Sequence, residues 1–271
     1  MGLLEGVRVI GAADRGRLLL YEGTTQMGNA FVPRVPGRAL TDEEYATLCR
    51  LPSDLNTRGF VAVVPVPDKI RKAFLSSRVA QGNQAQDMAE LVAHAQKFAS
   101  AFVEDCPHHQ LKPLGISVRR AGLLTSTFDH PNGCFLGLHI DSFYMAPLED
   151  RTSSPNRLCI NLTSEPRRLL FLNLSLVQCR DLLVASGYED TLLTEPRTVG
   201  LPRLFMKQVP DYPVIEIRID PDEAYVAPTE NMIHDSSTFR RRERDVFYTF
   251  LGEFSLRRVL ERVDRPVEVA S

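Results

Sequence analysis

Two histidines and one aspartate of this chain could hold a metal ion between them. In the segment 137–143 (GLHIDSF), His139 and Asp141 stand two residues apart. On a strand, side chains two residues apart leave the same face, so a single ion could contact both of them. His234 follows a short apolar run and a proline turn at 224–228. Two imidazoles and one carboxylate leave positions open on a metal, an arrangement suited to Fe(II) and O2 chemistry.

The H-x-D pair is weak evidence by itself. A chain with 6 histidines and 17 aspartates contains about 0.4 such pairs by chance, so this one could equally be a surface histidine beside a loop aspartate. An arginine strengthens the metal hypothesis, because Arg244 stands ten residues after His234 and opens the aromatic run 245–250. A guanidinium at the start of a strand can bind one carboxylate of a dicarboxylic acid through two hydrogen bonds.

Other polar residues compete for the same role. The arginines at 240–242 are expected mainly in a solvated loop, with Arg242 as the alternative to Arg244. Asn161 and Thr163 could form a second contact with the acid, since they share the polar face of a predicted strand, but that face could equally point to solvent. Four strand-edge arginines could meet an anionic substrate or simply be solvated, namely Arg119, Arg120, Arg167 and Arg168.

The order and spacing of these residues resemble those of the Fe(II)/2-oxoglutarate-dependent dioxygenases. The shared features are an H-x-D pair, a distal histidine about ninety residues later and an arginine ten residues beyond it, over roughly residues 114–255. The Fe(II) ligands that the resemblance implies are His139, Asp141 and His234. The residues that would bind 2-oxoglutarate are Arg244, with Asn161 and Thr163 as weaker candidates. The resemblance also implies O2 as a substrate and a double-stranded β-helix preceded by helices.

The predicted elements change from helices to strands along the chain. The sequence TDEE at 41–44 predicts a capped helix start, 59–66 predicts a strand, and 86–106 has the clearest helical periodicity. Later strands are predicted at 116–128, 135–144, 157–164, 168–176, 214–219, 224–226 and 245–254, with a helical patch at 177–185. This order predicts a mainly β protein with flanking helices (α+β), a jelly roll or cupin-like double-stranded β-helix packed against N-terminal helices.

No repeat or low-complexity linker divides the chain, so we expect a single domain over residues 1–271. Its expected parts are a helical or mixed N-terminal part at 1–113, a β-helix core at 114–255 and a C-terminal tail at 256–271. The irregular insertion at 177–212, together with the loop 145–156, is expected to form a lid over the substrate.

Composition narrows the expected partners. The net charge of −2, from 32 Lys+Arg and 34 Asp+Glu, provides no source for the electrostatic attraction that dominates nucleic-acid binding. No segment reads as a signal peptide or membrane span, and five scattered cysteines without a C-x-x-C pair are typical of reduced thiols. We therefore expect a cytoplasmic protein with a small-molecule substrate, such as an amino acid or a natural-product intermediate. No oligomeric state is predicted.

Three functions remain compatible with the sequence. The favoured one is hydroxylation coupled to decarboxylation of 2-oxoglutarate to succinate, and the intact Asp141 favours it over halogenation within the family. The second is a cupin-like metal oxidase that uses the same three ligands without 2-oxoglutarate. The third is a non-catalytic β-sandwich binding module whose H-x-D pair is coincidental. Replacement of Arg244 would separate the first two, and metal binding would separate both from the third.

Overall fold

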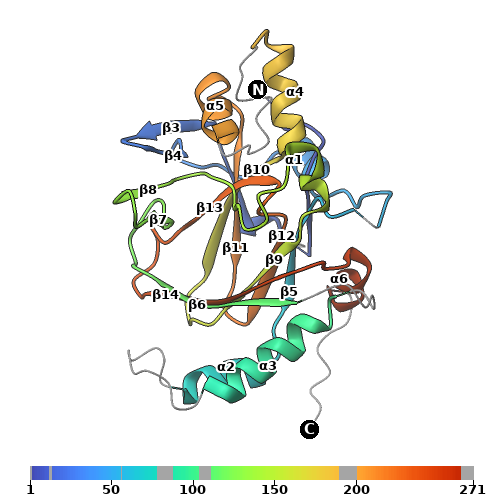
Figure 1. Cartoon of the computed structure of the whole chain (residues 1–271), viewed down its shortest axis with the longest axis vertical. Coiled ribbons are helices and arrows are strands. Elements are labelled where there is room, and N and C mark those ends of the chain that lie inside the picture. The colour runs from blue at the N-terminus through green and yellow to red at the C-terminus, as the bar shows by residue number, and fades with distance from the viewer. Residues whose placement is uncertain are drawn as a thin grey trace.

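Two β-sheets form the centre of the protein, and helices lie towards both ends of its long axis (Figure 1). The structure is a computed structural model, and the residues it describes are 2–11, 14–55, 57–77, 88–103, 111–188 and 200–263. None of the helices in this described part is both long enough and apolar enough to cross a bilayer.

The larger sheet has six strands in the order β1-β5-β12-β9-β14-β6. β1 runs parallel to β5, and every other neighbouring pair in this sheet is antiparallel. The strands are β1 (Arg8–Ile10), β5 (Phe60–Pro65), β6 (Lys112–Arg119), β9 (Asn156–Asn161), β12 (Glu223–Ala227) and β14 (Asp245–Gly252).

The smaller sheet has four antiparallel strands in the order β13-β10-β11-β2. The strands are β2 (Leu18–Tyr21), β10 (Arg167–Ser175), β11 (Val214–Ile219) and β13 (Met232–Ser237). Beyond β13, an isolated antiparallel bridge between His139 and His234 adds the H-x-D segment to this sheet. Two short hairpins stand apart, formed by β3 (Thr24–Met27) with β4 (Ala30–Pro33) and by β7 (Phe128–Asp129) with β8 (Cys134–Phe135).

From β6 onward the chain crosses repeatedly between the two sheets, with β10 and β11 as consecutive strands of the smaller one. β6, β9, β12 and β14 belong to the larger sheet, whereas the His139 segment, β10, β11 and β13 belong to the smaller one. This winding is that of a double-stranded β-helix, so the predicted jelly roll is confirmed. The inner faces pack on each other, with Cys159 and Tyr225 of the larger sheet in one apolar cluster with Leu169 and Phe171 of the smaller.

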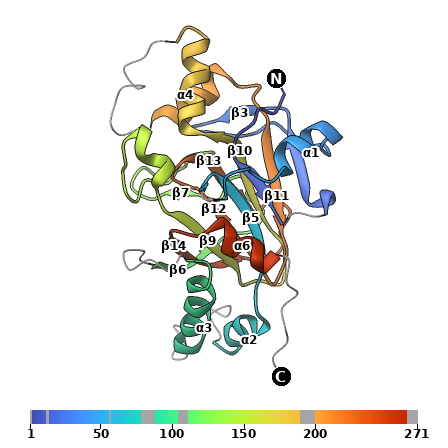
Figure 2. The same cartoon turned by 90° about the vertical axis from the view of Figure 1, so that its right-hand side faces the viewer.

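Three helices cover the outer face of the larger sheet, namely α2 (Asp68–Ser76), α3 (Met88–Ser100) and α6 (Leu256–Val263) (Figure 2). Because strand side chains alternate between faces, Leu158 and Ile160 of β9 point outward and pack in the same cluster as Leu91 and Phe98 of α3. The predicted helix 86–106 is thus confirmed over 88–100, whereas 101–102 form a turn, and 86–87 and 104–106 lie outside the described residues.

Helices α4 (Leu176–Ala185) and α5 (Leu201–Gln208) pack on the outer face of the smaller sheet. They belong to the insertion predicted at 177–212, of which 189–199 lie outside the described residues. The remaining elements are α1 (Asp42–Cys49) and the 3-10 helices η1 (Arg15–Arg17) and η3 (Leu148–Ser153). α1 begins with the predicted capping box, formed by Thr41 and Glu44.

Two predicted strands are shorter or displaced. The strand predicted at 116–128 is β6, which ends at Arg119. The strand predicted at 135–144 is regular only at Cys134–Phe135, because Gly137 has a φ of +71° and approaches Phe31 closely. A Cβ on Gly137 would lie 2.3 Å from the carbonyl oxygen of Phe31, so glycine is needed where the chain turns into the H-x-D segment. The N-terminal part, expected to be helical or mixed, supplies β1 and β5 to the larger sheet and β2 to the smaller, and β5 is the strand predicted at 59–66.

Candidate metal centre

His139, Asp141 and His234 lie together, as the spacing predicts. One potential ligand atom from each residue lies within 4.8 Å of the other two, so a single ion can contact all three. Backbone hydrogen bonds fix this arrangement, because His139 and His234 exchange N–H···O bonds of 2.9 and 2.8 Å. The Asp141 amide donates to the carbonyl oxygen of Thr229 at 3.0 Å. The metal-binding geometry is therefore built into the edge of the smaller sheet.

Both imidazoles are oriented by a backbone carbonyl two residues earlier in the chain. Nδ1 of His139 lies 2.7 Å from the oxygen of Gly137, and Nδ1 of His234 lies 3.1 Å from that of Met232. A carbonyl can only accept, so each Nδ1 carries the proton and each Nε2 keeps its lone pair for a metal. Burial lowers the pKa of His234 to about 3, so this ring is neutral at physiological pH.

The carboxylate of Asp141 is ionised despite its position in the interior. Burial favours the neutral form, but Arg157, His234 and His139 together outweigh it and hold the pKa below its ordinary value. Oδ2 lies 2.8 Å from Nη2 of Arg157, an ion pair without hydrogen-bond geometry, so this buried oxygen has no hydrogen-bond partner among the described residues. Two imidazole lone pairs and an unsatisfied carboxylate oxygen suit a divalent transition metal.

A cavity of about 350 Å³ adjoins this triad, between the inner faces of the two sheets. Cationic and aromatic side chains make up much of its lining. The residues that matter for its chemistry are Arg119, Arg157, Arg167, Phe143, Tyr225 and Phe247. The cavity can therefore hold a small anionic molecule beside the metal-binding residues.

Arg167 is the most buried cation in the cavity, with 2% of its surface exposed. Its guanidinium lies over the ring of Phe247, at 3.6 Å from the centroid, and Nη2 lies 3.3 Å from Oδ2 of Asp245. Its Nε and Nη1 are buried and have no hydrogen-bond partner in the described part of the chain. Two unsatisfied N–H donors on a fixed cation form a site for a carboxylate.

A second guanidinium approaches the same aromatic ring. Arg119 is half-buried, and its guanidinium carbon lies 5.9 Å from the Phe247 centroid. Burial, together with the positive charge of Arg167, lowers the pKa of Arg119 below its ordinary value, and the nearby Asp245 only partly offsets this. Both guanidiniums approach one ring, so an anion bound between them would be attracted by both.

Arg244 does not line this cavity. The prediction that its side chain faces the cavity, made from its place at the start of the strand, was wrong. Arg244 is exposed, on the loop that precedes β14. By alternation it shares a face with Val246 and Tyr248, and both of these pack in the cluster that the helices cover. The inward face of β14 begins one residue later, at Asp245 and Phe247. The alternative, Arg242, is exposed as well.

Asn161 and Thr163 have structural partners instead of a place in the cavity. The side-chain amide of Asn161 donates to the carbonyl oxygens of Glu165 and Asp220, at 3.1 Å each. Its Oδ1 accepts from the amide and hydroxyl of Thr163. The Thr163 hydroxyl also accepts a 2.7 Å hydrogen bond from the buried Arg241. Asn161 thus ends β9 and Thr163 lies in the turn that follows it, and the polar side-chain atoms of both residues have hydrogen-bond partners within the protein.

The remaining strand-edge arginines divide between the two faces of the smaller sheet. Arg167 points into the triad cavity, whereas its neighbour Arg168 points to the opposite face. Arg157 was not singled out from the sequence at all, although it lies two positions from Cys159 on the inner face of β9. Strand periodicity, applied to β9 from its buried end, is the signal that could have identified it.

The loop that follows Asp141 is held by a buried arginine. Arg151, from η3, is 1% exposed and donates to the carbonyl oxygens of Asp141, Ala146 and Glu230 at 3.3, 3.1 and 2.8 Å. Oε1 of Glu230 in turn accepts from the amide of Tyr144. The part of the predicted lid at 145–156 therefore holds the metal-binding segment in place through Arg151.

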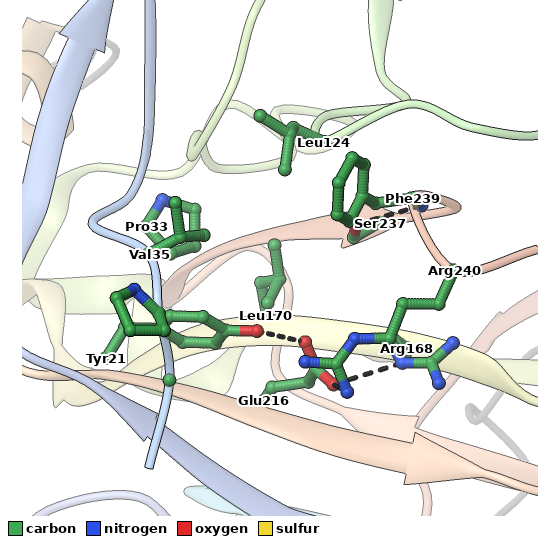
Figure 3. A pocket seen from close by; sticks show the side chains of 12 residues that line it. Tyr21, Pro33, Val35, Leu124, Arg168, Leu170, Glu216, Ser237, Phe239 and Arg240 are labelled. Carbon is green, nitrogen blue, oxygen red and sulfur yellow. Dashed lines mark hydrogen bonds and ion pairs between the residues drawn. The ribbon is translucent and has the colours of Figure 1, made fainter.

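A second cavity, of about 200 Å³, lies on the outer face of the smaller sheet and contains none of the triad residues (Figure 3). Glu216 lies at its floor, where it accepts from the Tyr21 hydroxyl at 2.5 Å and from Nε of Arg168 at 3.1 Å. Figure 3 shows these three side chains pointing toward one another beneath the apolar Val35 and Phe239. Because its charges satisfy one another, we place the candidate site at the triad.

No protein-family model matches the chain, and no curated protein matches it in sequence. Among solved structures, the chain is similar to the Kdo hydroxylase KdoO, a non-haem Fe(II) alpha-ketoglutarate-dependent dioxygenase. The apo structure of that enzyme gives a TM-score of 0.42 at 13% identity over 76% of this chain and 86% of that one. Its complex with alpha-ketoglutarate and Fe(III) gives 0.40 at 13% identity over the same shares. Its cobalt(II) complex gives 0.38 at 14% identity over 80% of this chain and 90% of that one.

Proposed function

We propose that this protein is an Fe(II)- and 2-oxoglutarate-dependent oxygenase that oxidises a small molecule, most simply by hydroxylation. The observation that carries the proposal is a pairing within one cavity. A His-Asp-His triad suited to a divalent metal shares the space between the sheets with Arg167, a buried cation that has two unsatisfied donors. Such a cavity can hold a dicarboxylic acid at both of its ends.

The triad would bind the metal through Nε2 of His139, Nε2 of His234 and a carboxylate oxygen of Asp141. Three protein ligands on one side leave the opposite side for other molecules. When bound, Fe(II) with 2-oxoglutarate would supply the activation of O2, which no side chain can provide. The protein contributes fixed imidazole tautomers, an ionised carboxylate and a cavity enclosed by two sheets.

Arg167 would bind the distal carboxylate of 2-oxoglutarate, in place of Arg244. Its Nε and Nη1 both carry N–H groups without a hydrogen-bond partner in the described residues, and stacking on Phe247 fixes the plane in which they lie. Arg119 approaches the same ring and would add a second positive charge. Because Arg167 shares the carboxylate of Asp245 with Arg241, its charge is only partly balanced, and a dianionic cosubstrate would supply further negative charge.

Anaerobic spectroscopy tests this proposal directly. Addition of Fe(II) and then 2-oxoglutarate to the full chain should produce a visible metal-to-ligand charge-transfer band. In Arg167→Met the concentration of 2-oxoglutarate that gives half of the band should rise about 100-fold, since two charge-assisted hydrogen bonds are lost. In the matched control Arg244→Met it should stay within about two-fold, because surface substitutions change little.

Each alternative has its own outcome. Absence of the band from wild-type protein with a native circular dichroism spectrum would overturn the proposal. Metal binding without any effect of 2-oxoglutarate would instead indicate the oxidase that does not use it. Should Arg167→Met fold poorly, Arg167→Lys keeps the charge but loses the two-donor geometry, and it should show an intermediate affinity.

A further inference from the structure

Arg157 occupies a different part of the cavity from Arg167. Its Nη2 lies 2.8 Å from the metal-binding oxygen of Asp141, whereas the guanidinium of Arg167 pairs with Asp245. The Arg157 side chain is 17% exposed and that of Arg167 is 3% exposed. Arg157 therefore lies beside the metal-binding residues on the solvent side, and Arg167 lies deeper between the sheets.

At least one hydrogen-bond donor of Arg157 has no acceptor among the described residues. Its Nε is buried and has no hydrogen-bond partner in the described residues. Its single ion pair there is with Asp141, whose carboxylate would also be a metal ligand and so would give up part of its charge to the metal. A cation in this position needs a further anion, and the cosubstrate carboxylate assigned to Arg167 is bound elsewhere.

An apolar segment stands next to Arg157 at the entrance. Phe143, Tyr144 and Met145 begin two residues after the metal-binding aspartate and are 47%, 50% and 44% exposed. The guanidinium of Arg157 lies 5.4 Å from the centroid of Phe143, which lines the cavity. Large apolar side chains that are exposed beside a cavity mark a surface for binding a ligand.

This segment is held in place instead of collapsing onto the protein. Met145 has a φ of +50°, a left-handed conformation that is costly for a side chain of its size. The buried Arg151 binds the carbonyl oxygen of Ala146 on one side and that of Asp141 on the other. A strained loop, braced from within, that keeps three apolar side chains in solvent is expected where those side chains have a binding role.

We infer that the substrate is an organic anion with an apolar body next to its anionic group. This inference rests on the proposed function and adds to it the class of substrate. The anionic group, a carboxylate, phosphate or sulfonate, binds Arg157, and the apolar body lies on Phe143 and its neighbours. Arg157 thereby places the adjoining carbon atoms beside the metal-binding residues, where oxidation would occur.

A fluorescent anion tests the site without relying on turnover. Anilinonaphthalene sulfonate combines a sulfonate with an aromatic body, and it should bind one-to-one to the full chain loaded anaerobically with Fe(II) and 2-oxoglutarate. Arg157→Gln should weaken this binding about 10- to 100-fold, with Arg157→Lys between that variant and wild type. Phe143→Ser should weaken it about ten-fold. The matched control Leu75→Ser, which removes a 64% exposed leucine from α2, should leave it unchanged.

Competition with one charged and one uncharged analogue of the same chain length completes the test. Octanoate should displace the probe, whereas octanamide at the same concentration should not. Equal displacement by both, equal affinity of Arg157→Gln and wild type, or no binding of the probe would each overturn the inference. The charge-transfer band of the same samples reports the proposed function separately, so loss of probe binding with the band intact contradicts only the substrate class.

Discussion

Nη1 of Arg151 lies 2.8 Å from the carbonyl oxygen of Glu230, joining two segments that are 79 residues apart in sequence. The same guanidinium binds the carbonyl oxygen of Asp141, so one side chain ties the loop after the H-x-D pair to the loop before His234. The spacing between the two halves of the metal site therefore depends on a residue that is not itself a ligand. This arrangement is typical of supporting groups around metal centres.

Arg151→Met should destabilise the protein and loosen the metal site. The substitution keeps most of the apolar volume but leaves three carbonyl oxygens, buried at Glu230 and half-buried at Asp141 and Ala146, without their charged donor, at a cost of about 2 to 4 kcal/mol. Urea denaturation should show this loss in the free energy of unfolding. The affinity for Co(II) should fall about ten-fold, as expected for an outer partner of metal ligands. In the control Arg71→Met, which removes a 46% exposed side chain from a surface ion pair, both quantities should be nearly unchanged.

Replacement of a metal ligand should have a much larger effect on metal binding than replacement of an ordinary histidine. His234→Ala should lower the affinity for Co(II) more than about 100-fold, since even outer partners of ligands contribute 10- to 100-fold. His94→Ala is the matched control, because His94 lies on α3 with Glu90 as its neighbour. Titration with Co(II), followed by its visible absorption, measures both. Equal affinities in the two variants would show that the triad does not bind the metal.

The triad could be predicted from the sequence because the distances between its residues along the chain are themselves informative. His139 and Asp141 are two residues apart, and the apolar run before the proline turn at 228 places His234 on the next strand. The alternation of strands and turns after residue 114 likewise predicted the jelly roll. These are local signals, and the structure joins them through the bridge between His139 and His234.

The arginine proposed to bind 2-oxoglutarate could not be found in the same way. Both faces of β10 and β14 are buried, because helices or loops cover the side that faces away from the cavity. A strand that is apolar on both faces gives no indication of which face is inside, so the sequence does not show whether Arg167 or Arg168 points inward, or on which face Arg244 lies. Only the packing of the two sheets decides that Arg167 points inward.

Asp245→Asn should leave part of the positive charge inside the barrel unbalanced. The Asp245 carboxylate lies 3.3 Å from Nη2 of Arg167 and 3.4 Å from Nη1 of Arg241, and all three side chains are buried. Removing its charge leaves the buried Arg167 guanidinium without an ion-pair partner in the described residues and leaves Arg241 with only a longer contact to Glu165, at 3.8 Å, so the free energy of unfolding should fall by about 3 to 5 kcal/mol. The surface control Asp222→Asn, which breaks an ion pair with Arg71, should change it by less than about 0.5 kcal/mol.

Addition of 2-oxoglutarate should partly restore Asp245→Asn. The dianion supplies the negative charge that the variant lacks, and a ligand that binds only the folded state stabilises it. The rise in melting temperature caused by 2-oxoglutarate should therefore be larger in the variant than in wild type. A smaller rise in the variant would indicate that the distal carboxylate binds away from Arg167.

Glu44→Gln should remove a pH-dependent part of the stability. Hydrogen bonds from Arg38 hold the pKa of Glu44 down at about 2, against burial and with help from the Thr41 amide, whereas its ordinary value is 4.5. Glutamine keeps the capping box but loses the ion pair, so wild type should be more stable by about 1 kcal/mol at neutral pH. Because the pKa is lowered by folding, this advantage is complete above 4.5 and is lost as the pH falls towards 2. Urea denaturation across this range, with the exposed neighbour Glu43→Gln as control, measures it, and a difference that does not narrow in acid would contradict the assignment to charge.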